Sequence, residues 1–232
     1  MNTEVQFNSG TGYNLSILGE QPSPSFEVRN IVRFLDSSTS HSSDGLMAHL
    51  QIASSQLEEP SLPAYKILEA FQYCSHKLEP LAGAKIGALY HVKELDTFGY
   101  AICSCLTLEQ ALTMGDKYNS VLGHLVKRSS KIEDDILVSQ LTNVQDIDAQ
   151  ALSFFVTLGI SARLYIARSI FGQDLSYTSV SFTFDDEANR QQYEDLLGCP
   201  VLFSQEQNSW SLHINDLARP GPQEAIIRVI PD

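Results

Sequence analysis

The side chains with the clearest metal-binding chemistry lie in two short pairs, Cys74-Ser-His76 and Cys103-Ser-Cys105. Together they offer the thiolate and imidazole ligands of a zinc site. Both pairs fall in segments whose spacing predicts helices, and residues two apart on a helix point about 200° away from each other. Such a pair cannot easily chelate one ion. We therefore expect buried, apolar thiols and no metal or other cofactor.

Motifs typical of catalysis are absent from the sequence, which has no Gly-x-Ser-x-Gly elbow, P-loop, Rossmann glycine triplet or His-Glu-x-x-His. Carboxylates gather at Glu133-Asp134-Asp135 and Asp185-Asp186-Glu187, where the pattern predicts a hairpin turn and a helix start. Acidic side chains in such places stabilise a helix N-terminus or a solvated loop. We expect no enzymatic activity. A pocket holding two converging carboxylates or a metal would revive that alternative.

Polar and aromatic side chains on otherwise apolar elements are the better candidates for a ligand site. Arg163 and Arg168 interrupt a long apolar segment, and each needs an acidic partner or a bound anion if it is buried. An internal salt bridge or snorkelling is the alternative for both. The remaining candidates are Trp210, Tyr100, Tyr118 and His124. Trp210 fits a core or a dimer interface better than a pocket wall, and His124 has a structural role as its alternative.

Apolar spacing predicts the helices that would position these residues in the first half of the chain. Helical spacing begins at Phe26. Capping or initiating residues predict further helices near Asp44, Ser61, Leu81, Asp96 and Thr107. Residues 1–25, which contain Asn, Ser, Gly and Pro with little apolar periodicity, predict a flexible N-terminal arm. Residues 26–232 are then one domain.

The second half of the chain predicts a sheet and a central helix. Alternation over residues 125–132 and 136–141 predicts a hairpin. Asp148 caps the longest helix, about 25 residues ending at Gly172, or roughly 37 Å. Apolar residues wrap most of its circumference, which predicts a buried position. The order of elements favours an α+β fold, with an N-terminal helical layer followed by an antiparallel sheet packed on the long central helix.

Composition and charge exclude several classes of protein. With 15 Lys and Arg against 28 Asp and Glu, the net charge is −13, and the short basic cluster of Lys127, Arg128 and Lys131 is expected on a solvated hairpin rim. This surface repels phosphate backbones, so we expect no DNA binding by the chain itself. No signal peptide is visible, four cysteines are too few for a disulfide scaffold, and Arg163 and Arg168 argue against a membrane span. These features indicate the cytoplasm.

Residues 181–220 carry a specific order of elements. An apolar strand is followed by Asp185-Asp186, a helix with Tyr193-x-x-x-Leu197-Gly198, a Cys-Pro-Val-x-Phe strand, and an Asn-x-x-x-Leu strand closed by Asp-Leu-Ala-Arg-Pro. This order resembles the end of the arabinose-binding-type N-terminal domain of AraC-type transcription regulators. Leu62-Pro63 and residues 96–112 are similar to earlier motifs of that domain. The resemblance covers residues 26–230, and its specificity comes from order and spacing together.

The resemblance implies an effector-sensing and dimerisation domain that binds a small cytoplasmic metabolite, forms a homodimer and controls attached DNA-binding domains. The two helix-turn-helix units of the family would follow Asp232, so DNA is expected to bind only through a C-terminal domain outside this chain. The amphipathic face over residues 107–122, including Leu108 and Leu112, is a candidate dimer surface. The alternative is a free-standing interaction protein that sequesters full-length relatives in mixed dimers.

Overall fold

A computed structural model describes residues 22–37, 42–119, 126–143 and 148–222, without the side chains of residues 96, 97, 118, 119, 126, 127 and 143. The larger helices are α2 (Phe26–Ser37), α3 (Ser43–Leu50), α5 (Ala64–Lys77), α6 (Pro80–Gly87), α7 (Asp96–Cys103), α8 (Leu108–Asn119), α9 (Ala149–Phe171) and α10 (Arg190–Leu197). Shorter turns of helix are α4 (Ser54–Leu57), η1 (Val92–Leu95), η2 (Glu187–Asn189) and α11 (Ile214–Leu217). The strands are β1 (Pro22–Pro24), β2 (Ser61–Pro63), β3 (Val126–Glu133), β4 (Ile136–Asn143), β5 (Ser179–Ser181), β6 (Val201–Leu202) and β7 (Asn208–His213).

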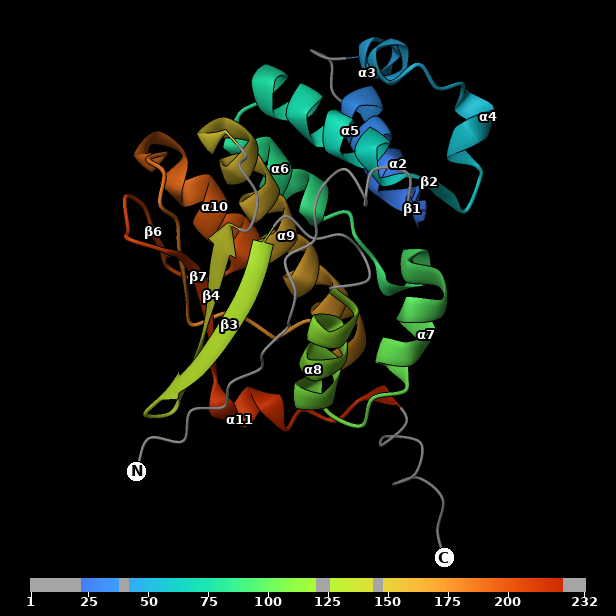
Figure 1. Cartoon of the computed structure of the whole chain (residues 1–232). Helices are drawn as coiled ribbons and strands as arrows, with labels where there is room; N and C mark the ends of the chain where they lie inside the picture. Colours follow the sequence, from blue (N-terminus) through green and yellow to red (C-terminus); the bar gives the residue numbers. More distant parts are fainter. Residues whose placement is uncertain (1–21, 38–41, 120–125, 144–147, 223–232) are drawn as a thin grey trace, which may run out of the picture.

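The predicted α+β fold is confirmed, and α9 is its central element (Figure 1). The Asp148 carboxylate accepts a hydrogen bond from the Ala151 backbone N–H at 2.8 Å and so caps α9. Gly172, with a φ of 116°, ends it. On one side α9 packs against α5 and α6, and on the other it faces the sheet. This helix is long and apolar enough to cross a membrane, but half of its most apolar window is buried inside the fold.

The main sheet has five strands in the order β3-β4-β7-β5-β6. All neighbours are antiparallel except β5 and β6, whose parallel pairing departs from a purely antiparallel sheet. Opposite residues in the register share a face. Arg128 pairs with Leu141, and Ser139 pairs with Trp210. This inner face is buried, and it presents Trp210 toward α9.

The helical layer departs from the prediction at Ser61 and Pro63. Ser61 and Pro63, which were expected to begin a helix, form β2 and pair with β1, and the helix begins one residue later at Ala64. Residues 22–24, expected in the N-terminal arm, therefore belong to the folded domain as β1. A proline favours extended backbone for the residue that precedes it, here Leu62. This preference explains why a strand precedes α5.

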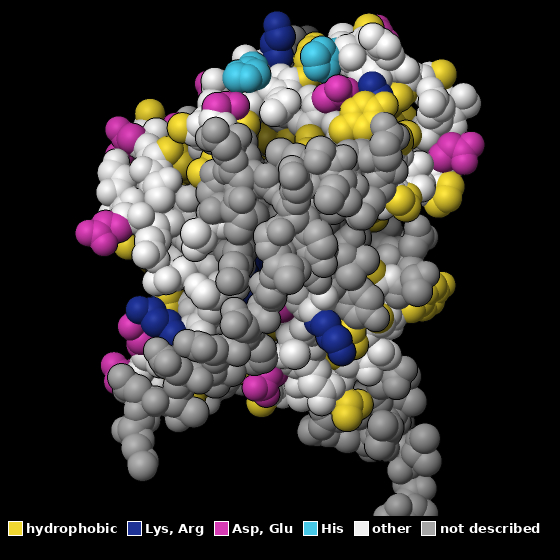
Figure 2. Space-filling model, viewed as in Figure 1, with side chains coloured by type: hydrophobic (Ala, Val, Ile, Leu, Met, Phe, Trp, Pro, Cys, Tyr) yellow, Lys and Arg dark blue, Asp and Glu magenta, His cyan; other side chains and the backbone are white. Residues whose placement is uncertain are grey.

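Charged side chains on the visible face are scattered (Figure 2). Lys and Arg lie singly among Asp and Glu, with no basic stripe formed by the described residues on this face. The prediction that Lys127, Arg128 and Lys131 lie together on a solvated hairpin rim is wrong for Arg128. Arg128 is only 7% exposed, whereas Lys131 is exposed. The two side chains therefore do not form one solvated rim.

Candidate functional site

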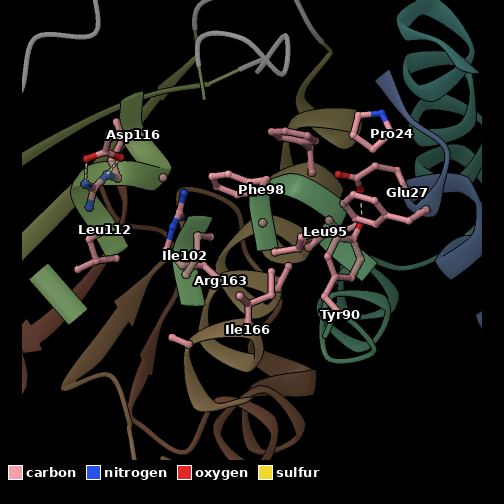
Figure 3. Close-up of a pocket in the computed structure, with 18 of the residues that line it drawn as sticks. Pro24, Glu27, Tyr90, Leu95, Phe98, Ile102, Leu112, Asp116, Arg163 and Ile166 are labelled. Carbon is pink, nitrogen blue, oxygen red and sulfur yellow. Dashed lines mark hydrogen bonds and ion pairs between the residues drawn. The ribbon is translucent and has the colours of Figure 1, made fainter. Parts of the chain in front are cut away.

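A cavity of about 240 Å³ lies beside α9, where α9 faces α5, α7 and α8 (Figure 3). One water needs only roughly 10–15 Å³, so the space suits a small organic molecule. Most of its wall is apolar. Large side chains from four helices contribute to it, including Phe71, Phe98, Ile102, Leu112, Phe155 and Ile166.

Two helical glycines keep part of this space open. Gly115 on α8 and Gly159 on α9 both line the cavity, and a Cβ built on either would meet no other side chain or backbone within 4 Å. Glycine inside a helix is less favourable than alanine by about 1 kcal/mol. At both positions the glycine lowers the stability of its helix, and a larger side chain there would occupy the cavity.

Arg163 is the cation at one end of the cavity. Its guanidinium points from α9 into the space between α7 and α8 (Figure 3). In the described part of the chain it has no hydrogen bond or ion pair, and its Cζ lies over the Trp210 ring, 5.8 Å from the ring centroid. Burial lowers the pKa of Arg163, but an arginine stays protonated in proteins. The side chain is half-buried and lines the cavity.

Arg128 lies beside Arg163 but is already paired. Its Nε donates to Asp116 Oδ1 at 2.5 Å, and its Nη2 forms a second contact with Oδ2 of the same carboxylate. Nη1 donates to Ser139 Oγ at 3.0 Å. Burial and the neighbouring Arg163 charge lower the pKa of Arg128 to about 9, which still leaves it charged at neutral pH. Asp116 thus pairs with Arg128, and no described carboxylate pairs with Arg163.

Glu27 and Tyr90 form the second polar group of the cavity wall. The Tyr90 hydroxyl donates to Glu27 Oε2, and both residues line the cavity on the far side of Phe98 from Arg163 (Figure 3). Burial raises the pKa of Glu27 to about 7, although the hydrogen bond from Tyr90 partly opposes this. The cavity therefore has a permanent cation at one end and a carboxyl that titrates near neutrality at the other.

The predicted site residues fall into three groups. Arg163 lines the cavity. Trp210 is fully buried behind it as predicted for a core residue, stacked on Tyr177 at 5.1 Å and contacted by Arg128 and Arg163. The other residues are outside the cavity wall or outside the described structure.

Arg168 and Tyr100 are placed away from the cavity. Arg168 donates from Nε to the Leu175 carbonyl at 2.7 Å and from Nη2 to the Leu197 carbonyl at 3.1 Å, so it ties α9 to the end of α10. Tyr100 is 81% exposed on α7. The Tyr118 side chain and all of His124 lie outside the described residues.

Sequence reasoning missed Glu27, Tyr90, Arg128 and Asp116. Glu27 looks like an ordinary acidic residue in the first turn of a helix, and nothing in the spacing links it to Tyr90, 63 residues later. A signal did exist for Arg128. It lies opposite Leu141 and on the same face of its strand as Ile132, the partner of Leu137, so strict alternation would have turned it inward.

The described residues contain no group of three or more His, Cys, Asp or Glu side chains able to hold a metal ion. Cys74 and Cys105 are buried. Burial raises the pKa of Cys74 to about 12, so this thiol is protonated and is a poor ligand or nucleophile.

Three comparisons with known proteins agree with one another. Residues 41–221 match the family model described as the arabinose-binding domain of AraC transcription regulators, N-terminal. The ornithine utilization regulator of Pseudomonas aeruginosa is 29% identical over 143 residues, which cover 61% of this chain and 42% of that protein. The transcriptional regulator CdpR from Pseudomonas aeruginosa shares the fold, with a TM-score of 0.60 and 15% identity over 92% of this chain and 59% of that one. The chain thus spans only about half the length of these relatives.

Proposed function

The chain belongs to the family of arabinose-binding N-terminal domains of AraC transcription regulators, and from this membership we propose that it senses a small effector inside its cavity. The observation that carries the proposal is the apolar cavity with, at one end, an arginine that has no ion-pair partner among the described residues. Ligand pockets typically combine apolar walls with a few polar groups that fix orientation. A cavity formed only by imperfect packing would not require a buried cation.

The effector would act by favouring one arrangement of the regulator over another. The cavity wall includes residues of α2, α5, α7, α8 and α9, so a bound molecule contacts most of the helical layer. A ligand shifts a conformational equilibrium only by its difference in affinity for the two states. Contacts to several helices at once provide such a difference when these helices move relative to one another.

The relatives support the coarser parts of this proposal. One relative is named for the utilization of ornithine, a small molecule, and both are named as regulators. Both are longer than this chain. We extend this to a cytoplasmic effector and to DNA contacts made by a separate domain. The net charge of −13 supports DNA contacts by a separate domain, because an acidic chain has few cations to neutralise a phosphate backbone.

Pairing of two copies stays part of the proposal on the family resemblance alone. The face of α8 offered as a dimer surface is used inside the chain. Leu108 and Ala111 are buried, and Leu112 lines the cavity. The described part of this stripe is therefore packed within the chain, whereas residues 120–122 of the predicted surface lie outside the described residues. We propose that a dimer would use other surfaces.

Filling the cavity tests the sensing function. Gly159→Leu places a side chain in open space beside a helix that tolerates leucine well, so the protein should fold with stability equal to or above wild type. Native mass spectrometry of freshly purified protein should show a retained small molecule on wild type and none on Gly159→Leu. In the full-length regulator, the same variant should lose effector-dependent promoter binding in a gel shift.

Ala149→Leu is the matched control, because it adds the same side chain to an exposed position of the same helix. It should behave as wild type in both measurements. A folded Gly159→Leu variant that responds to effector as wild type does would rule out this cavity as the sensing site.

A further inference from the structure

The local charge balance around the cavity restricts what it can hold. Arg128 and Arg163 both lie over the Trp210 ring, with Cζ-to-centroid distances of 5.5 and 5.8 Å. Asp116 neutralises one of them through two contacts with Arg128. Resting on the sensing function proposed above, we propose that the cavity binds a small carboxylic acid with an apolar body, whose carboxylate pairs with Arg163.

One anionic charge matches the surplus better than two. A phosphate monoester carries a charge near −2 at neutral pH, and Arg128 is already engaged by Asp116 and Ser139. Of these two guanidiniums, Arg163 is the one with no acceptor among the described residues, and a single planar fork matches a single carboxylate. A cationic ligand at this end would instead add a third positive charge to the two guanidiniums.

The position of Glu27 sets the orientation of the acid. Glu27 lines the other side of the cavity, and when ionised it repels a carboxylate there. Between the two ends the wall is aromatic and aliphatic, with Phe98 between Glu27 and Arg163 (Figure 3) and Phe71 and Phe155 packed edge to face at 5.4 Å. The apolar body of the acid therefore lies against these rings, and its carboxylate lies at Arg163.

Without a bound anion, Arg163 is a half-buried charge with no counterion among the described residues, and this arrangement is costly. Arg163→Met keeps the approximate length and packing of the side chain but removes the charge. The ligand-free variant should therefore unfold at a temperature equal to or a few degrees above wild type. If Arg163 served only the core through Trp210, the same change would lower the unfolding temperature.

The direct test compares acids with their uncharged and cationic counterparts. Straight-chain acids of four to eight carbons, benzoate and phenylacetate would each be measured against the matching amide and amine by thermal shift and calorimetry. On wild type, at least one acid should bind, with its amide and amine weaker by about 10- to 100-fold, the range expected for losing a charged hydrogen-bonded pair. Arg163→Met should weaken that acid by the same factor.

Arg33→Gln is the matched control, since it removes an arginine whose side chain is 55% exposed in a surface pair with Glu94. It should bind the acid as wild type does. Equal binding of acid, amide and amine to wild type would overturn the assignment without any variant, as would unchanged acid binding in Arg163→Met. A neutral or cationic molecule that wild type retains and Gly159→Leu excludes would overturn the carboxylate while leaving the sensing function intact. No retained or added ligand of any charge would count against the sensing function itself.

Discussion

Two arginines on the same helix, five residues apart in the sequence, show how neighbours decide the role of a side chain. Arg168 donates hydrogen bonds to the Leu175 carbonyl and to the Leu197 carbonyl at the end of α10. These backbone dipoles stabilise its charge. Arg163 faces the cavity and contacts an aromatic ring in place of an anion. The first arginine stabilises the fold, and the second is the one that we propose binds a ligand.

Glu27 makes stability depend on pH at the residue scale. Its pKa is about 7 in the folded protein and near the ordinary 4.5 in the unfolded chain, so the folded state binds the proton more tightly. The stabilisation is fully present below about pH 4.5 and is lost as the pH rises through 7, by on the order of 3 kcal/mol. Glu27→Gln removes this titration and retains a partner for Tyr90. Urea unfolding from pH 4.5 to 8 should therefore show wild type losing stability relative to Glu27→Gln over this window. Parallel pH profiles for the two proteins would contradict the assignment.

At the scale of elements, the contact between α6 and α9 builds one wall of the helical layer. Gly83 lets the helices approach closely, because a Cβ there would lie 2.5 Å from the Phe154 carbonyl oxygen. Thr157 reaches across the interface and donates to the Pro80 carbonyl at 2.8 Å. Gly87, one turn after Gly83, has the backbone of Leu158 equally near. The position of α9, and so of Arg163, depends on this close packing.

Gly83→Ala should push the two helices apart. Its Cβ would collide with backbone, which cannot move as a flexible side chain can, and overpacking of this kind costs about 1–3 kcal/mol. Gly115→Ala is the control, since it adds the same methyl group to a helix where nothing lies within 4 Å, and it should stabilise the protein by about 0.5–1 kcal/mol. Chemical unfolding of both variants measures the difference. Equal stabilities would mean that α6 and α9 are less tightly packed than the structure indicates.

The whole molecule is strongly acidic, and this charge lowers its own affinity for DNA. Its net charge is −13, and Arg128, the one member of the basic cluster that the structure describes as buried, is neutralised by Asp116. Affinity for any duplex comes mainly from cations that release counterions from the phosphates. In the function proposed above, DNA contacts are left to a separate domain.

The 232-residue chain should therefore not bind random duplex DNA. Fluorescence anisotropy with a labelled duplex at physiological salt should show no change up to about 10 µM protein, a concentration at which non-specific binders usually associate. A salt-sensitive rise in anisotropy at micromolar protein would show that the chain carries a cationic surface of its own.

The sequence by itself determined the class of fold, the central helix and the family. Local features carry this information: the carboxylate of Asp148 caps α9, Gly172 stops it, and alternation marks β3 and β4. Only the tertiary structure decided which polar residues meet. Tyr90 reaches Glu27 across 63 positions of sequence, and the Arg128 side chain turns inward to Asp116. Spacing along the chain encodes the period of a helix or strand, but the meeting of distant side chains depends on how the elements pack. For this reason Arg163 and Arg168 look alike in the sequence, and only their surroundings separate an arginine held by backbone carbonyls from one that lines the cavity.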